Sequence, residues 1–194
     1  MIEFATLSGK ALKAELASLA QLRIQIFRAF PYLYEGDVDY EAWYLEDFAK
    51  AEGAVVIGAF DGARLIGAAT ASPMAGQKPE FSEPIRKAGL DLGHVFYFGE
   101  SVLLPEYRGQ GIGHQFFDAR EVAAREQGFV YAGFYAVIRD AQDARKPHDY
   151  SPLDGFWYKR GYQKLDGAIA EFLWPEVGSG QEISHAMQFW MRKL

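Results

Sequence analysis

The stretch that most constrains the fold is EYRGQGIG, residues 106 to 113, in which glycines stand at alternate positions behind an arginine. A strongly β-prone run, HVFYFGESVLLP, precedes it, and a helical pattern follows it. Glycine lets backbone N–H groups approach a ligand with no Cβ in the way, and the helix N-terminus behind them favours an anion. Strand, glycine loop and helix together predict an anion site, and phosphate is its usual ligand.

Two common phosphate loops do not fit this stretch. A dinucleotide fingerprint needs a further glycine where His114 or Phe116 stands, and a P-loop needs Gly-Lys-Ser/Thr, which is absent here. The alternative is that the glycines only shape a tight turn between strand and helix. The loop by itself leaves both interpretations open.

The remaining patterns predict one mixed α/β fold. Asp61-Gly62 joins two β-rich runs as a hairpin, and Gly161 ends a short helix. Residues 72–93, rich in proline and glycine, are predicted to be an insertion with a short helix near 84–88. Strands are expected at 2–7, within 53–72 (the hairpin), and at 94–105, 128–138, 167–174 and 182–194; further helices are expected at 10–30, 39–50, after the glycine loop, and within 152–165.

Composition limits the classes of function. The 194 residues are 49% hydrophobic and 24% charged, which suits one globular domain spanning 1–194. No apolar stretch reaches the ~20 residues of a membrane helix, and the net charge of -6, with basic residues scattered, predicts no nucleic-acid partner. The chain has no cysteine, which excludes disulfides, thiolate metal sites and a cysteine acyl-enzyme. We expect a cytoplasmic protein without a bound metal.

Several features taken together resemble the GNAT superfamily of N-acetyltransferases. They are Arg108, Gly111 and Gly113 in the pattern R-x-x-G-x-G, a preceding strand that ends in Leu-Leu-Pro, the amphipathic helix, and the later FWYKRGY. The resemblance implies an α+β fold with a mixed sheet of about seven strands, splayed between the fourth and fifth strands. It also implies acetyl coenzyme A as the co-substrate and direct transfer without an acyl-enzyme.

The resemblance assigns a coenzyme site to the loop and to the strand before it. The loop amides would wrap the pyrophosphate, and the fourth strand would bond the pantetheine at a bulge. His114 either contacts the phosphate or is an ordinary surface histidine. The residues implied are Val102, Leu103, Leu104, Arg108, Gly109, Gln110, Gly111, Ile112, Gly113 and His114.

Two side chains are candidates for the chemistry. Glu100 interrupts an apolar strand, and simple alternation places it on the same face as Phe96, Phe98 and Val102. A carboxylate there is a candidate general base for the amine; the alternative is a glutamate that faces solvent or pairs with a basic neighbour. The family's usual general acid, a tyrosine, falls on Trp157, which leaves Tyr158 as the nearest candidate, or else an aromatic packing residue.

The resemblance implies that the acceptor pocket borders the junction of the first two helices. Tyr32, Tyr34 and Glu35 begin an acidic and aromatic stretch that suits a cationic amine. Alternatively, the helical part of this stretch only presents an apolar face to the core and a polar face to solvent. Basic residues after the fifth strand are a second option, suited to an acceptor carboxylate: Arg139, Arg145, Lys146 and His148.

The sequence therefore predicts an acetyltransferase that acts on a primary amine of a small metabolite. Its alternatives are a non-catalytic acyl-coenzyme-A sensing domain and a protein acetyltransferase. The aromatic C-terminal strand, MQFWMRKL, makes a homodimer possible.

Overall fold

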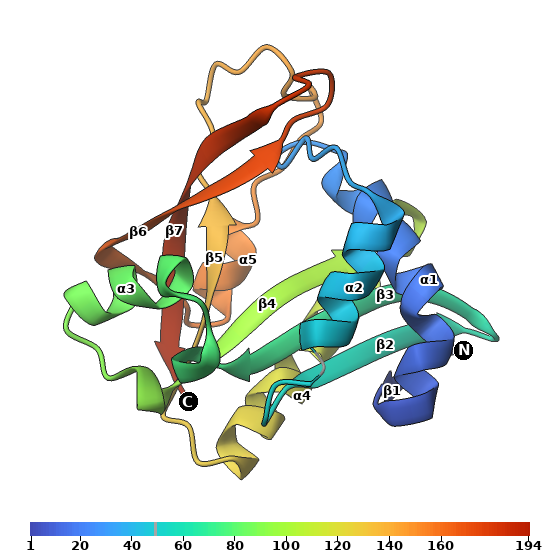
Figure 1. Ribbon diagram of the computed structural model, residues 1–194, viewed down its shortest axis with the longest axis horizontal. Coiled ribbons are helices and arrows are strands. Elements are labelled where there is room, and N and C mark those ends of the chain that lie inside the picture. The colour runs from blue at the N-terminus through green and yellow to red at the C-terminus, as the bar shows by residue number, and fades with distance from the viewer. Residues whose placement is uncertain (49) are drawn as a thin grey trace.

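One seven-stranded sheet runs through the whole computed structural model, which describes residues 1–48 and 50–194. The strand order is β1-β2-β3-β4-β5-β7-β6 (Figure 1). Only β4 and β5 pair in parallel; the other neighbours are antiparallel. The strands are β1 (Ile2–Thr6), β2 (Val55–Asp61), β3 (Arg64–Pro73), β4 (Val95–Leu103), β5 (Tyr131–Val137), β6 (Gln163–Pro175) and β7 (Glu182–Lys193).

Five α-helices surround this sheet in the described chain, with short 3₁₀ turns between some of the elements. The helix expected over 39–50 is α2; Ala49, inside that expected range, lies outside the described residues. The helices are α1 (Gly9–Phe27), α2 (Val38–Phe48), α3 (Pro79–Lys87), α4 (Ile112–Glu126) and α5 (Asp154–Lys159), and the 3₁₀ turns are Met74–Gly76, Leu92–His94 and Pro105–Tyr107.

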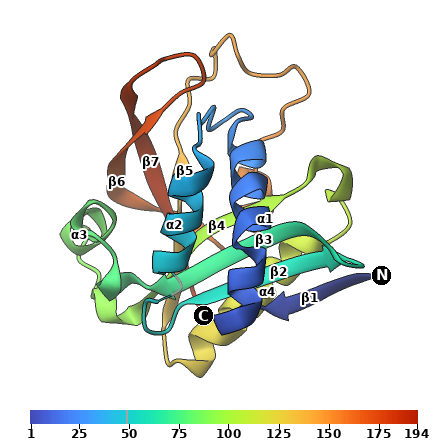
Figure 2. The same ribbon diagram turned by 45° about the vertical axis from the view of Figure 1, so that its right-hand side comes forward.

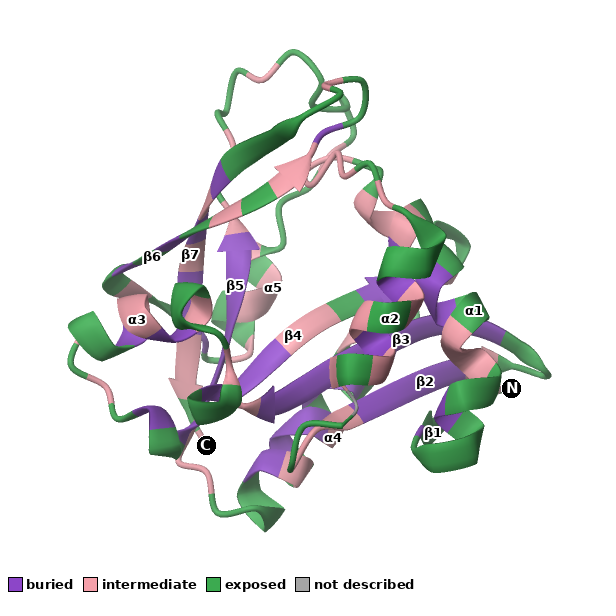
Figure 3. Cartoon of the chain, viewed as in Figure 1, coloured by how far each residue is buried: buried purple, intermediate pink, exposed green. Residues whose placement is uncertain are grey.

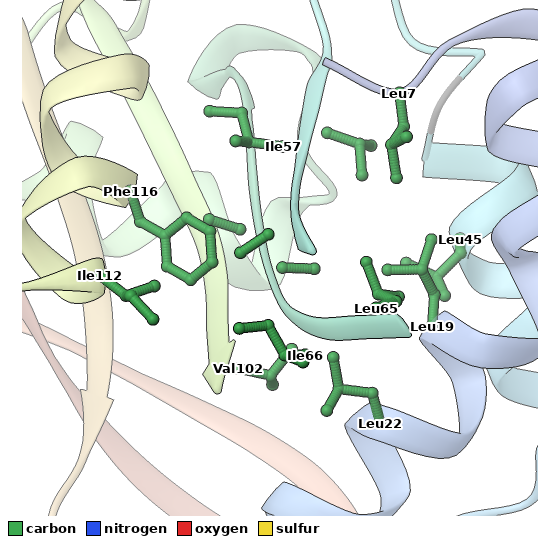
Figure 4. Packing of buried hydrophobic residues seen from close by; sticks show 14 of the residues in the cluster. Leu7, Leu19, Leu22, Leu45, Ile57, Leu65, Ile66, Val102, Ile112 and Phe116 are labelled. Atoms are coloured by element: carbon green, nitrogen blue, oxygen red, sulfur yellow. The ribbon is translucent and has the colours of Figure 1, made fainter. Parts of the chain in front are cut away.

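Three of the helices, α1, α2 and α4, lie on the two faces of the β1–β4 half of the sheet. Figures 1 and 2 show α1 and α2 over one face and α4 under the other. Their apolar sides meet the sheet in one buried cluster, to which α1 and α2 contribute Leu19, Leu22 and Leu45, while α4 contributes Ile112 and Phe116 (Figure 4). Burial of these side chains is the main stabilising contribution to the layered arrangement.

Two local predictions can be compared directly with the structure. The Asp61-Gly62 hairpin is confirmed, with Gly62 at a positive φ of 59°. The helix predicted near 84–88 is wrong in its bounds: it begins at Pro79, because proline in the first turn has no N–H to leave unpaired and a φ already suited to a helix. Pro84 then lies inside the helix that it was expected to begin.

The predicted splay between β4 and β5 is confirmed. The two strands pair only from Val95 with Tyr131 to Tyr97 with Gly133, and then diverge. In Figure 3, β4 changes from buried to partly exposed and then exposed where it leaves β5. Strand β4 also carries a bulge there, because Thr70 of β3 stands opposite both Gly99 and Glu100.

The β6–β7 hairpin reaches beyond the sheet and contacts the connection between α1 and α2 (Figure 1). Tyr34 forms an isolated bridge with Glu176, and Val177 N donates to Leu33 O at 2.8 Å. The connection that holds Tyr32, Tyr34 and Glu35 is therefore fixed on one side by a distant part of the chain.

Candidate active site

The glycine loop presents bare backbone amides at the start of α4. Gly109 and Gly111 have positive φ values of 76° and 82°, which side chains rarely adopt. Across residues 1–48 and 50–194, no acceptor bonds the backbone N–H groups of residues 109 to 113, whereas the next amide, that of His114, donates to Gly111 O at 3.0 Å. Consecutive free amides at a helix N-terminus form a concave anion site.

The space in front of these amides is open. A Cβ added to Gly109 or Gly111 would meet no atom within 4 Å, and one on Gly113 would lie 3.7 Å from Phe156. Arg108 and Gln110 are exposed beside the loop. His114 is exposed as well, and its Nδ1 lies 3.0 Å from Nη1 of Arg160. Because a guanidinium only donates, Nδ1 of His114 is the acceptor and its Nε2 carries the proton.

The bulge in β4 overturns the predicted direction of Glu100. Phe98 faces α4, where its ring lies 5.8 Å from that of Phe117. Glu100 lies on the opposite face and pairs with Arg23 of α1. Simple alternation places Phe98 and Glu100 together, but the extra residue at the bulge shifts the alternation by one. The carboxylate thus faces the side of the sheet that α1 and α2 cover.

Glu100 belongs to a buried charge cluster that three elements build. Arg23 of α1 pairs with both Glu41 of α2 and Glu100 of β4, and Tyr34 donates to Glu41 at 2.6 Å. Glu41 is only 1% exposed. Burial by itself lowers the pKa of Arg23, but Glu100, Tyr44 and Glu41 together raise it above its ordinary value. Two carboxylates thus share one guanidinium, which leaves this cluster with a formal charge of -1.

Tyr32 lies close enough to this cluster for the charge of Glu100 to act on its phenol. Burial and then the charge of Glu100 raise the pKa of Tyr32 to about 12, so its phenol keeps its proton. Its ring lies 4.8 Å from that of Phe27 and 6.0 Å from that of Trp174. Of the predicted acceptor residues, Tyr32 and Tyr34 therefore come together around the cluster. We name Arg23, Tyr32, Tyr34, Glu41 and Glu100 the acceptor-side cluster.

Glu35, predicted beside them, makes different contacts. Its carboxylate accepts from Arg28 at 2.8 Å and from Gly178 N at 3.2 Å, on the exposed surface. The structure therefore separates Glu35 from the acceptor-side cluster, because its partners belong to the end of α1 and to the β6–β7 hairpin.

The two arginines after β5, Arg139 and Arg145, are paired with partners within the chain. Arg139 bonds Glu176 and the carbonyl oxygens of Pro31 and Tyr32, and Arg145 bonds Glu176 and Asp143. The option that they receive an acceptor carboxylate loses its basis, because Glu176 and Asp143 already match their charge. Lys146 and His148 lie exposed on the loop.

The aromatic residues of α5 contact the core differently. Trp157 packs against Phe134 and Trp190, with ring centroids 5.0 Å and 5.1 Å away. Tyr158 is 53% exposed, and its ring centroid lies 4.9 Å from that of Trp190. Trp157 is thus a packing residue, whereas Tyr158 lies at the surface beside β7.

Sequence reasoning missed Arg23 and Glu41. Both read as polar positions on helices, and their sequence separation gives no sign that they meet. The available signal was that Arg23 follows Leu19 and Leu22 on the apolar side of α1, where an arginine needs a buried partner.

Comparisons with known proteins agree with this geometry. The family model described as "Acetyltransferase (GNAT) family" matches residues 17–148. None of the curated proteins matches the chain in sequence. Among solved structures, a ribosomal-protein-alanine N-acetyltransferase from Brucella melitensis is similar over 100% of this chain and 99% of its own, with a TM-score of 0.64 and 15% identity.

Two further solved structures show the same fold. YncA from Salmonella typhimurium, solved with its cofactor acetyl-CoA, has a TM-score of 0.62 and 13% identity over 100% of this chain and 94% of its own. The PaiA N-acetyltransferase from Thermoplasma acidophilum, solved with coenzyme A, has a TM-score of 0.57 and 16% identity over 100% and 99%.

The chain therefore belongs to the GNAT family of acetyltransferases. As a member of it, the protein is an acetyl-CoA-dependent N-acetyltransferase, which is the class that the sequence predicted.

Residues 1–48 and 50–194 contain neither a metal-binding group nor a membrane-spanning helix. No group of three or more His, Cys, Asp or Glu residues within it lies arranged to hold a metal ion. Among the same residues, no helix is both long and apolar enough to cross a bilayer.

Proposed function

We propose that this acetyltransferase transfers acetyl from acetyl coenzyme A to the primary amine of a small, cationic metabolite. The observation that carries the proposal is the position of the free loop amides: they lie at the end of β4, the strand that diverges from β5. The part of β4 that does not pair with β5 therefore leads directly into the anion site at the start of α4.

The residues present suit the coenzyme. The amides of residues 109 to 113 would hold the pyrophosphate, with Arg108 and the Nε2–H of His114 at their edge. Beyond Tyr97, the backbone of β4 no longer pairs with β5, so that edge of the strand is suited to bond the pantetheine amides. Leu104 N donates to Ile66 O of β3 at 3.0 Å, so alternation along the strand turns Val102 and Leu104 toward β3 and leaves the N–H and C=O of Leu103 toward the gap. The coenzyme when bound supplies the acetyl thioester.

The acceptor would approach from the α1 and α2 side, because Glu100 faces that side. The acceptor-side cluster has one more carboxylate than guanidinium, which favours a cationic amine. Tyr32 and Tyr34 add aromatic faces that suit an ammonium group. Arg23 and Glu41 are buried and the other three members of the cluster are half-buried, which favours a small acceptor over a protein segment.

Each group in the transfer step has a source. Glu100 takes the proton that the amine loses as its nitrogen forms the C–N bond, and the C–S electron pair leaves with sulfur. The thiolate then takes a proton from Tyr158 or from water. No acyl-enzyme forms in this route.

A screen of amine acceptors, read by release of coenzyme A thiol, tests the proposal. Since the protein has no cysteine, it contributes no thiol signal of its own. We expect diamines and other small cationic amines to be acetylated faster than peptides. Tight coenzyme A binding with no turnover on any amine would favour the sensing domain instead, and faster transfer to peptides would favour the protein acetyltransferase. The cytoplasmic location and the homodimer stay predictions.

A further inference from the structure

Arg120 is a fully buried arginine on α4, directly beneath the bulge in β4. It is only 1% exposed. Its guanidinium carbon lies 4.3 Å from the ring centroid of Phe98 and 4.9 Å from that of Phe117. The other buried positions around it on this helix are mainly apolar, so a charge here needs a compensating set of hydrogen bonds.

Nε of Arg120 donates within α4 to Phe116 O at 3.1 Å, and the remaining hydrogen bonds go to the two strands at the bulge. Nη1 donates to Thr70 O of β3 at 3.2 Å and to Glu100 O of β4 at 3.1 Å, and Nη2 donates to Ser101 Oγ at 2.8 Å. The register between the strands shifts at this point. The guanidinium therefore bonds main-chain oxygens of both strands where the regular ladder is interrupted.

Thr70 of β3 also constrains the bulge, through its contacts with Gly99 and Glu100. A Cβ on Gly99 would lie 2.5 Å from Thr70 Oγ1, so glycine is required there by the close approach. The Thr70 hydroxyl oxygen accepts from Glu100 N at 3.1 Å. Thr70 and Arg120 together bond both the N–H and the C=O of Glu100, which fixes its backbone orientation.

No carboxylate lies within ion-pair distance of Arg120 in the part of the chain that the structure describes. Burial lowers the pKa of Arg120 to about 10, so the guanidinium is still protonated near neutral pH. Burying a cation without an ion-pair partner costs free energy of desolvation, which makes arginine an unfavourable residue for a core position. A methionine or leucine would pack there at less cost, but would leave the oxygens of Thr70 and Glu100 without donors.

We propose that Arg120 is a positioning residue for acetyl transfer, which holds the β4 bulge so that Glu100 faces the acceptor side. This role rests on the proposed function, since it acts through Glu100. The guanidinium stays on the α4 side, and its effect crosses the sheet because one extra residue in a strand reverses the direction of the following side chain.

The test compares Arg120→Met with the unaltered protein and with Arg125→Met. Met fills the space against Phe98 and Phe117 but donates no hydrogen bond, while Arg125 is an exposed arginine of the same helix. We expect Arg120→Met to lower kcat by ~10²-fold, as for a misplaced catalytic group. Coenzyme A affinity should change little, because the loop amides are untouched, and Arg125→Met should be like the unaltered protein.

A double-mutant cycle shows whether Arg120 acts through Glu100. The loss of kcat in Arg120→Met with Glu100→Gln should be close to that of the worse single variant, because both changes remove the same group. Arg120→Lys, which keeps the charge and part of the donor set, should recover part of the activity. The role would be overturned if the losses of kcat in the two single variants multiply in the double variant. It would also be overturned if the activities of Arg120→Lys and Arg120→Met simply follow their melting temperatures.

A crystal structure of Arg120→Met gives a readout that does not need turnover; if that variant does not fold, Arg120→Lys takes its place. The expected result is a shifted β3–β4 register near Thr70, with Glu100 withdrawn from Arg23. An unchanged bulge with Glu100 still on Arg23 would refute the inference. If the unaltered protein neither binds coenzyme A nor acetylates amines, the proposed function fails, and this structure still decides whether Arg120 holds the bulge.

Discussion

The two faces of β4 are built in opposite ways. On the α4 side, the proposed coenzyme site consists of consecutive backbone amides in an exposed loop with no side chain in front of them. On the α1 and α2 side, the acceptor-side cluster consists of buried charged side chains from helices and a strand far apart in the sequence. A backbone site needs only a local sequence, whereas a charge cluster needs the whole fold to bring its members together.

The variant with the greatest expected effect impairs acetyl transfer to the amine but not coenzyme A binding. Glu100→Gln should lower kcat by ~10²-fold or more, because it removes the base while keeping the shape of the side chain. Coenzyme A binding should persist. The control is Glu106→Gln, an exposed acid near the loop that pairs with Arg64. The measurement is kcat as a function of pH, and an unchanged rate and profile in Glu100→Gln would remove Glu100 from the mechanism.

A second variant is expected to impair coenzyme A binding at the glycine loop and to leave the acceptor-side cluster intact. Gly111 and Gly128 lie just beyond the two ends of α4 with the same φ of 82° and open space around each. Valine at either position introduces the same kind of backbone strain. We expect Gly111→Val to weaken coenzyme A binding by ~10- to 100-fold, the value of one or two charge-assisted hydrogen bonds.

Gly128→Val separates strain from ligand contact in that comparison. Both variants should melt at similarly lowered temperatures, but Gly128→Val should bind coenzyme A like the unaltered protein in a calorimetric titration. Equal loss of affinity in the two variants would show that strain, not the loop, accounts for the effect.

The same contrast explains what could be predicted from the sequence. The loop residues from Arg108 to His114 could be proposed as an anion site from the sequence because their chemistry is local. Glu100 could be proposed as a base, but its direction was predicted wrongly because a bulge depends on Thr70 and Arg120, which the strand pattern does not contain. Arg23 and Glu41 were missed because their importance depends on the ion pair between them, which forms only in the folded chain.

A smaller effect should sharpen the role of charge on the acceptor side. Glu41→Gln removes one carboxylate and leaves Arg23 paired with Glu100 alone. The cluster then loses its formal negative charge, and KM for a cationic amine should rise by about 5-fold, a coupling of about 1 kcal/mol. A neutral acceptor analogue should show no rise, and equal changes for both acceptors would argue against charge recognition.

The smallest effect concerns the hairpin that closes the acceptor side. Burial lowers the pKa of His185 below its usual value, so the folded state favours the neutral ring. The stability that this gives is present above the unfolded pKa of ~6.5 and is lost as the pH falls through the lower folded value. His185→Phe keeps the stacking on Trp174, whose ring centroid lies 3.7 Å away.

Between pH 7 and pH 5, the unaltered protein should lose up to about 1 kcal/mol more unfolding free energy than His185→Phe. Denaturant melts at the two pH values measure this difference. A variant that loses as much stability as the unaltered protein would place the acid sensitivity elsewhere, for instance at Glu176, whose pKa lies below its usual value: burial opposes this shift, but its hydrogen bonds with Arg145 and Arg139 outweigh burial.

We propose that coenzyme and acceptor meet at the bulge from opposite faces of β4. A crystal structure of Glu100→Gln with acetyl coenzyme A and a diamine tests this arrangement most directly. We expect the pyrophosphate on the amides of residues 109 to 113, the pantetheine between β4 and β5, and the amine between Tyr32 and residue 100. A coenzyme bound away from the loop, or an amine bound on the α4 side, would contradict it.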